Sequence, residues 1–369
     1  MPKKFAFILF IIQALLSFLH YLLYLALLEL FPTLALHHVA LLITILALSV
    51  SFLAFSIVSH FWDNIIVAAG YYLAGVWLIL CGYSMIALAL ALVIFGLSGW
   101  QPQTLGIIAI GLSSLLTIYG MINARIIRTV NLQVKLPNLP EAWANRTIVM
   151  VSDIHLGHIL RIGFAKRVIK KINRLKAHVV LIPGDFYDGV HTDFPGLADA
   201  FKKLNAPLGS FFSSGNHEMF AGYGVCERAI SHAGIKILEN QKVEIDGLQF
   251  VGLSYHGDPV TYDGETDENV KSRLDQIGIN KDQPSILLKH VPNHLAAVEA
   301  AGINLQLSGH SHQGQVWPGS HITKKIWKGF DYGFKTFGKL QVYTSSGVGT
   351  WGPPLRVFTK AEIVKINLQ

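Results

Sequence analysis

Four long apolar runs near the start of the chain constrain its fold more than any other feature of the sequence. The runs cover residues 5–31, 39–59, 65–95 and 105–124. The first contains one charged residue, Glu29, and the other three contain none. A helix of about 20 apolar residues crosses the hydrocarbon core of a bilayer, and each run reaches that length. We therefore predict four transmembrane helices in residues 1–124.

A secretory signal peptide is the alternative for the first run, because Lys3 and Lys4 precede it. The run is longer than the apolar part of an ordinary signal peptide, which is about 7–15 residues. No small-residue cleavage site follows it. A transmembrane helix is therefore the better interpretation.

Almost all of the charge lies after these runs. The chain of 369 residues has a formal net charge of +7, and residues 1–124 hold only two basic and two acidic side chains. The whole positive surplus therefore belongs to residues 125–369. This split excludes a single soluble globule and a disordered or collagen-like chain. The two cysteines lie in different parts of the chain, which excludes a disulfide framework and a cysteine metal site.

Basic residues flank the apolar region on both sides and are missing from its internal loops. They are Lys3, Lys4, Arg125, Arg128 and Lys135. Four spans place both flanks on one side of the membrane, and the positive-inside rule makes that side cytoplasmic. We predict an integral, multi-pass membrane protein whose polar part faces the cytoplasm.

Polar residues inside the first span allow a second interpretation. Gln13, His20 and Glu29 lie within it, and ionisable groups at membrane depth can mark a transport path. Glu29 is close to the end of the run, where the membrane interface can solvate it. We favour a structural role for these residues over a transporter.

Residues 125–146 carry two prolines and mixed polarity, and we interpret them as a short juxtamembrane linker. From residue 147 to 369, strand-like apolar runs alternate with helical stretches. The runs are IVMVSD (148–153), VVLIPGD (179–185), SFFSSGNH (210–217), ILLKH (286–290) and LQLSGH (305–310). Strands that alternate with helices in this way indicate sheets with helices on their outer faces.

Each of the five strands ends in metal-binding residue types. They are Asp153 with His155, Asp185, Asn216 with His217, His290, and His310 with His312. The ends of strands converge on one rim in layered α/β folds, so these side chains should meet there. Oxygen and imidazole ligands without thiolate suit two divalent ions such as Mn²⁺, Fe²⁺ or Zn²⁺. Glycine precedes three of the ligands and allows close backbone approach.

Five sequence blocks at these strand ends carry a family resemblance. In order they are VSDIHLG, GDFYDG, SGNHE, KHVP and SGHSHQGQ. They resemble the signature blocks of the calcineurin-like metallophosphoesterases. The lead-in LPNLPEAWANRTIVMVSDIH and the closing TSSGVGTWGPPLRVFTKAEIVKINL resemble the membrane-associated bacterial branch of that family. The resemblance implies a four-layer α/β/β/α sandwich over residues 147–369, attached to a bacterial inner or plasma membrane by the four helices.

The resemblance also implies the role of each site residue. One ion would be held by Asp153, His155 and His312, the other by Asn216, His290 and His310, with Asp185 bridging both. A hydroxide bridging the two ions would attack phosphorus. His217 would be the catalytic histidine, and Asp188 would orient its ring. Three residues depart from the family pattern without removing a ligand: Glu218, Lys289 and Gln313.

Residues 315–340 mix five lysines with six aromatic residues. This mixture favours contact with the headgroup layer of a membrane or capture of a lipid-linked substrate. A plain surface hairpin is the main alternative, and binding of single-stranded nucleic acid is the weaker one. The basic helical stretch from Lys166 to Lys176 either faces anionic lipid or is a solvated helix face.

These observations predict a membrane-anchored phosphoesterase that cleaves a phosphate ester or pyrophosphate bond, in a lipid or lipid-precursor substrate. Its cofactors would be two divalent ions, with manganese among the candidates, and no nucleic acid partner is expected. Two alternatives to a lipid phosphoesterase are also consistent with the sequence. The first is a hydrolase of soluble nucleotides or phosphoproteins. The second is a non-catalytic membrane sensor or scaffold that binds metal or phosphate.

Overall fold

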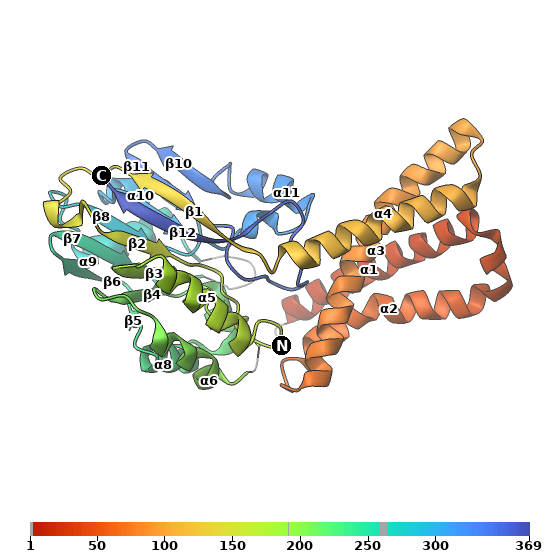
Figure 1. Cartoon of the computed structure of the whole chain (residues 1–369), viewed down its shortest axis with the longest axis horizontal. Helices are drawn as coiled ribbons and strands as arrows, with labels where there is room; N and C mark the ends of the chain where they lie inside the picture. Colours follow the sequence, from red (N-terminus) through yellow and green to blue (C-terminus); the bar gives the residue numbers. More distant parts are fainter. Residues whose placement is uncertain (1–2, 191, 258–263) are drawn as a thin grey trace. The chain divides into compact units, whose positions relative to one another are not determined.

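The computed structural model describes residues 3–190, 192–257 and 264–369 (Figure 1). The chain forms two compact units. The helical unit comprises Met1–Ile122 and Gly352–Val357, and the α/β unit comprises Asn123–Trp351 and Phe358–Gln369.

Four long helices make up most of the helical unit. They are α1 (Lys3–Leu30), α2 (His38–Val58), α3 (Ile65–Ser98) and α4 (Pro102–Asn123), with the short 3-10 helix η1 (Pro32–His37) between the first two. All four are long and apolar enough to cross a membrane, with mean hydropathy of 2.0 to 2.6. The four long apolar helices predicted from the sequence are confirmed.

Local sequence explains where the longest helix begins and ends. The side chain of Asn64 accepts hydrogen bonds from the backbone N–H groups of Ile66 and Val67, both at 3.0 Å, and so caps the start of α3. Gly99 ends it in the left-handed conformation, with φ of 67°. At 34 residues, α3 is about 50 Å long and exceeds the thickness of a hydrocarbon core.

The polar residues of the first span have structural partners within the helical unit. Nδ1 of His20 donates to the carbonyl of Leu16 at 2.8 Å, and its Nε2 accepts from the indole N–H of Trp77 at 3.0 Å. The amide of Gln13 donates to Ser17 at 3.0 Å. Both nitrogens of the buried His20 ring are therefore engaged, which supports the structural interpretation over a transport path.

Two mixed sheets form the centre of the α/β unit. In the described part of the chain the first has the order β1 (Ile127–Val134), β12 (Ala361–Leu368), β2 (Thr147–Met150), β3 (Val179–Pro183), β4 (Ser210–Ser213) and β5 (Lys236–Ile237). The second has the order β10 (Gly333–Phe337), β11 (Leu340–Thr344), β9 (Leu305–Ser308), β8 (Ser285–Leu288), β7 (Leu248–Gly252) and β6 (Gln241–Ile245). The five strands expected at the metal-binding motifs are present as β2, β3, β4, β8 and β9.

The two sheets pack face to face. Apolar side chains such as Met150 and Leu181 of the first sheet share a buried cluster with Phe250 and Leu307 of the second. The alternate residues of the same strands, such as Val149 and Val180, face outward. This alternation buries both faces of each sheet, as the period of two in a strand requires.

Helices cover the outer faces of both sheets. On the first sheet these are α5 (Ile162–Arg174), α6 (Phe194–Ala198) and α8 (Tyr223–His232), with the 3-10 helix η3 (Asp199–Lys203). On the second they are α9 (Asp267–Ile277) and α10 (Leu295–Ala300). The order of layers is therefore α/β/β/α, and the four-layer sandwich predicted from the sequence is confirmed.

The structure differs from the sequence interpretation at residues 125–146. This segment, expected as a linker, contains β1, which pairs in parallel with β12 over its full length, from Ile127 opposite Ala361 to Val134 opposite Leu368. It also contains the 3-10 helix η2 (Glu141–Trp143), whose Trp143 is fully buried. The side chains of Leu132 and Val134 join the core between the sheets, which is why this segment is ordered against the sandwich.

Candidate metal centre

Strand direction brings the predicted ligands together at one rim of the α/β unit. β2, β3 and β4 are parallel neighbours, and so are β8 and β9. The carboxyl ends of parallel neighbours lie at the same edge of a sheet. The ligands follow directly from these ends. Asn216 is the first residue of α7 (Asn216–Ala221), and His312 is the first of the 3-10 helix η4 (His312–Gly314).

The first group of candidate ligands consists of Asp153, His155 and His312, whose ligand atoms all lie within 4.8 Å of one another. Nε2 of His155 lies 3.0 Å from Nε2 of His312, and the latter lies 3.4 Å from Oδ1 of Asp153. Two imidazole nitrogens that face each other at this distance beside a carboxylate offer lone pairs to one point. Their convergence fits a common cation.

The second group consists of Asp185, His290 and His310. Nε2 of His290 is buried 3.0 Å from Oδ2 of Asp185, yet has no hydrogen bond of acceptable geometry among the described residues. Its Nδ1 donates to the carbonyl of Pro183 at 2.9 Å, so Nε2 is the nitrogen that faces Asp185 and is available to bind a cation. Oδ1 of Asn216 lies 3.1 Å from Nδ1 of His310 and adds a fourth donor.

Asp185 lies between the two groups. Besides His290, its Oδ2 has Nε2 of His155 at 3.8 Å. One carboxylate within reach of both groups is the geometry that a bridging ligand requires. The donor atoms are carboxylate, amide and imidazole, and this set suits divalent ions of intermediate hardness.

The electrostatics of the rim favour an ionised carboxylate at its centre. Burial alone would raise the pKa of Asp185, but the imidazoles of His290 and His217 hold it well below its ordinary value. Burial would lower the pKa of His290, and the charge of Asp185 instead raises it to about 9. Burial and the neighbouring His290 lower the pKa of His310 to about 3, so this imidazole is neutral, the form in which it binds a cation.

Backbone strain is concentrated at the candidate ligands. Five of them have positive φ values of 49° to 69°: Asp153, His155, Asp185, His310 and His312. This region is uncommon for residues other than glycine and costs on the order of 1–3 kcal/mol per residue, so it persists where function requires it. The strain explains why the strands stop at these positions and turn their side chains inward.

Glycines before the ligands allow close packing at the rim. A Cβ atom on Gly215 would lie 2.2 Å from Oδ1 of Asp185, and one on Gly309 would lie 2.1 Å from Oδ2 of Asp153. Any side chain at either position would displace a candidate ligand. Glycine at these two positions therefore leaves room for the carboxylates of Asp185 and Asp153.

Glu218 lies beneath the site and is fully buried. Its carboxylate accepts hydrogen bonds from the backbone N–H groups of Asp185, Phe186, Tyr187 and Gly215, at 2.8 to 3.2 Å. It therefore fixes the turn that presents Asp185. The sequence showed Glu218 only as a departure from the family pattern, because its partners are backbone groups that a sequence does not reveal.

Lys289, the second departure, faces away from the candidate ligands. Its ammonium group lies 2.8 Å from Oε2 of Glu265, whose other oxygen accepts from Arg273 at 2.6 Å. This buried ion network ties the start of α9 to the end of β8, where His290 is located.

The structure gives His217 and Asp188 a different relationship from the expected one. Nδ1 of His217 donates to the backbone carbonyl of Asp188 at 2.9 Å. The carboxylate of Asp188 instead lies 3.2 Å from Nδ1 of His155. His217 is thus oriented by the main chain, while the Asp188 side chain supports a candidate ligand. His217 also forms a third group with His155 and Asp185, so its position is within reach of a cation.

Aromatic side chains that the sequence did not single out as site residues surround the rim. The ring of His217 has Phe220 at 5.5 Å and Trp351 at 6.4 Å between centroids. Trp327 contacts the ring of His310 at 5.5 Å. Phe220 and Trp351 are 43% and 57% exposed, so exposed apolar surface lies beside His217.

Comparisons with known proteins agree with this site. Residues 146–314 match the family model described as calcineurin-like phosphoesterase. An uncharacterized metallophosphoesterase of Campylobacter jejuni is 34% identical over 260 residues, which cover 69% of this chain and 67% of that protein. An uncharacterized metallophosphoesterase of Helicobacter pylori is 30% identical, covering 60% of this chain and 59% of that protein.

A transmembrane protein with metallophosphoesterase domain from Danio rerio is 27% identical over 291 residues, which cover 74% of this chain and 64% of that protein. The chain therefore spans less than two thirds of the length of the Helicobacter and Danio relatives. It belongs to the calcineurin-like metallophosphoesterase family, which depends on two metal ions. Family membership and the grouped ligands make it a metal-dependent phosphoester hydrolase with helices long enough to span a membrane.

Proposed function

We propose that this protein is a membrane-anchored phosphoesterase that cleaves a phosphate ester or pyrophosphate bond in a lipid or lipid-precursor substrate. The observation that carries the proposal is the pair of ligand groups that meet at Asp185, with exposed aromatic side chains beside them. The grouped ligands support the chemistry, and the exposed aromatic side chains support the class of substrate.

Each of the two candidate ligand groups holds one metal ion. Asp153, His155 and His312 hold one, and Asn216, His290 and His310 hold the other, while Asp185 reaches both. Two bound divalent ions supply Lewis acidity and a water of lowered pKa for in-line attack on phosphorus. Manganese, iron and zinc all suit the donor set.

His217 is the proposed catalytic side chain. Its Nδ1 is held by the carbonyl of Asp188, so Nε2 is the atom that can contact a phosphoryl oxygen or pass a proton to the leaving oxygen. Asp188 acts on the site through its contact with His155 and its carbonyl bond to His217, and is a positioning residue.

Apolar side chains near the rim support a lipid substrate. The segment 315–340 forms the amphipathic helix α11 (Gly319–Ile326), followed by the β10–β11 hairpin. Ile322 and Ile326 are 60% and 59% exposed on α11, and Lys324 and Lys325 accompany them. Exposed apolar residues with adjacent lysines are favoured at the headgroup layer of a membrane.

The test uses the full-length protein in detergent, loaded in turn with each divalent metal. We expect cleavage of a lipid phosphate or a nucleotide-sugar lipid at a higher kcat/KM than of a soluble nucleotide. Asp185→Asn should lose activity and metal content together, because its carboxylate reaches both ligand groups. Asp275→Asn, on the exposed surface of α9, serves as the matched control.

Three outcomes separate the candidate functions. A preference for the soluble nucleotide would leave the helices as an anchor only and contradict the lipid substrate. Absence of turnover with every metal, in a protein that binds metal, would favour a sensor or scaffold. Normal metal content and rate in Asp185→Asn would contradict the proposed ligand set.

We further propose that the α/β unit faces the cytoplasm of a bacterial inner or plasma membrane. The support is the excess of basic residues at the start of the first helix and after the fourth. A fluorescent protein fused after Gln369 should be bright, and alkaline phosphatase fused at the same point should be inactive. The reverse pattern would place the domain outside.

A further inference from the structure

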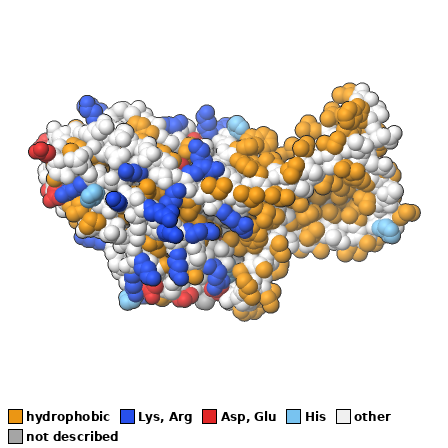
Figure 2. Space-filling view, viewed as in Figure 1, with side chains coloured by type: hydrophobic (Ala, Val, Ile, Leu, Met, Phe, Trp, Pro, Cys, Tyr) orange, Lys and Arg blue, Asp and Glu red, His pale blue; other side chains and the backbone are white. Residues whose placement is uncertain are grey.

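Helix α5 concentrates positive charge on one exposed face of the α/β unit. Its 13 residues, IGFAKRVIKKINR, include five basic side chains and no acidic one. Apolar residues such as Val168 and Ile172 are buried against the first sheet. The basic residues therefore occupy the opposite, outward face. Figure 2 shows Lys and Arg side chains gathered over the part of the α/β unit where Figure 1 draws α5.

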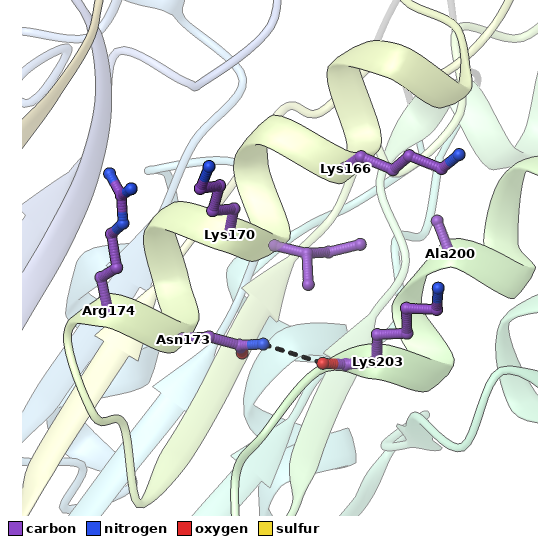
Figure 3. A pocket seen from close by; sticks show the side chains of 7 residues that line it. Lys166, Lys170, Asn173, Arg174, Ala200 and Lys203 are labelled. Atoms are coloured by element: carbon purple, nitrogen blue, oxygen red, sulfur yellow. Dashed lines mark hydrogen bonds between the residues drawn. The ribbon is translucent and has the colours of Figure 1, made fainter.

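A groove of about 480 Å³ runs between α5 and η3. Lys166, Lys170 and Arg174 project from successive turns of the helix, and Lys203 projects from η3 (Figure 3). Ile169 and Ala200 contribute apolar surface between them. The groove thus combines four positive charges with an apolar floor.

A hydrogen-bonded contact holds the two sides of the groove together. The amide of Asn173 donates to the backbone carbonyl of Lys203 at 2.8 Å, and its oxygen accepts from the backbone N–H of Asn205 at 2.9 Å. These two hydrogen bonds tie α5 to the end of η3.

Neighbouring basic residues have protein partners, but the four in the groove do not. Lys171 donates to the carbonyl of Ile127 at 2.5 Å, and Lys202 pairs with Asp199 at 2.7 Å. In the described part of the chain, the charged ends of the four groove residues have neither hydrogen bond nor ion pair. Like charges one turn apart on a helix repel each other, so an anion between them would be stabilising.

A short connection tethers the α/β unit to the fourth long helix. Helix α4 ends at Asn123, and four residues later Ile127 accepts the hydrogen bond of Lys171. Four extended residues span at most about 14 Å. The start of β1 is therefore tethered within that length of the end of a helix that can span a membrane, and anionic headgroups raise the density of phosphate at a membrane surface.

We propose that the groove between α5 and η3 binds the phosphate headgroups of anionic phospholipids and holds this face of the α/β unit against the membrane. The shared chemistry is recognition of a phosphate by lysine and arginine. The short tether to a helix that can span a membrane favours lipid over free phosphate as its source. The site is separate from the metal centre and does not depend on the proposed substrate.

The test measures energy transfer between the protein and lipid headgroups. Cys81 and Cys226 are both buried, so Ile162→Cys provides a single exposed label site at the start of α5. The labelled full-length protein is placed in phosphatidylcholine nanodiscs, with or without phosphatidylglycerol, that carry an acceptor on the headgroups. We expect higher transfer when phosphatidylglycerol is present.

Replacing the four groove residues should abolish that difference. The variant carries Lys166→Gln, Lys170→Gln, Arg174→Gln and Lys203→Gln. Each basic residue near an anionic surface changes the ratio of bound to free orientations by about fivefold, so four together should change it by several hundredfold. A control with the same loss of charge elsewhere on the α/β unit carries Lys236→Gln, Lys271→Gln, Lys281→Gln and Lys339→Gln.

The control should retain the response to phosphatidylglycerol, and circular dichroism should show that both variants are folded. Equal transfer in the two kinds of nanodisc would overturn the proposal. An equal loss in the control would also overturn it, by showing that only net charge matters. If inorganic phosphate or a single-stranded oligonucleotide reverses the transfer at physiological salt, the groove takes another anion and the lipid assignment is wrong.

Discussion

Glu218 is a buried side chain that fixes the backbone of the candidate metal centre without being one of its proposed ligands. Its four backbone hydrogen bonds hold the turn at Asp185 and the start of α7. Burial, with a further contribution from the charge of Asp185, raises its pKa to about 7. The ionised carboxylate is therefore costly to bury, and the four hydrogen bonds that it accepts from backbone N–H groups stabilise it.

We predict that Glu218→Gln lowers both stability and metal affinity. The amide has one accepting oxygen and turns an NH₂ group toward backbone donors. The free energy of unfolding should fall by about 2–3 kcal/mol, the value of one or two hydrogen bonds to a charged group. Thermal unfolding and metal titration of the full-length protein measure both effects, with Glu268→Gln on the exposed first turn of α9 as the control. Unchanged metal affinity would show that the turn at Asp185 does not need this brace.

His217 allows a sharper test of its proposed role. His217→Ala should retain both metals and lower kcat by roughly 10²–10⁴-fold, the usual value of general acid catalysis. Metal analysis and steady-state kinetics on the same sample show whether His217 is a catalytic side chain or a metal ligand. Because His217 also lies in a group with His155 and Asp185, loss of metal would show that it is a ligand instead.

At the scale of elements, α11 connects the metal centre to its proposed substrate. We predict that replacing Ile322 and Ile326 with serine raises KM for a lipid phosphate in bilayers, because both side chains are exposed and apolar. The kcat for a soluble aryl phosphate should not change. Val225→Ser, at a similarly exposed position on α8, is the control. An equal effect on both substrates would mean that α11 acts on the fold and not on lipid.

The ion network between α9 and β8 predicts a dependence of stability on pH. Burial alone would raise the pKa of Glu265, but Lys289 and Arg273 hold it below its ordinary value of 4.5. A carboxylate with a lowered folded-state pKa contributes stability above its unfolded value and loses it as pH falls. The stability difference between wild type and Glu265→Gln should be constant near neutral pH and shrink below about pH 4.5. Thermal unfolding across that range measures it, and a difference that grows in acid would contradict the network.

Short-range patterns predicted some elements of this protein and missed others. The five strands and four apolar helices were predictable because each is a continuous run with flanking signals. Strand β1 was not, because its partner β12 is distant in sequence and its own residues alternate only weakly. The contact between Asp188 and His155 was missed for a related reason. Sequence places Asp188 near His217 but gives no information on which of its oxygens faces which ring.

At the scale of the whole molecule, the separation of charge matches the separation into units. The helical unit is largely apolar, and the α/β unit carries six of the seven surplus positive charges, the seventh being Arg356 of the helical unit. Part of that surplus is used inside the domain, as at Lys289 and Lys171. Another part is unpaired in the groove of α5. The unpaired positive charge is therefore concentrated on one part of the surface, and the net charge of the chain does not show where that part is.

The pairing of β1 with β12 affects how this protein is made. Ile127 emerges from the ribosome directly after the fourth helix, but its partner Ala361 is synthesised 234 residues later (361 − 127). At 5–20 residues per second, β1 waits about 10–50 s for a partner. An unpaired strand edge is prone to pair with another chain. Biogenesis of this protein therefore requires that a nascent strand be shielded until synthesis is nearly finished.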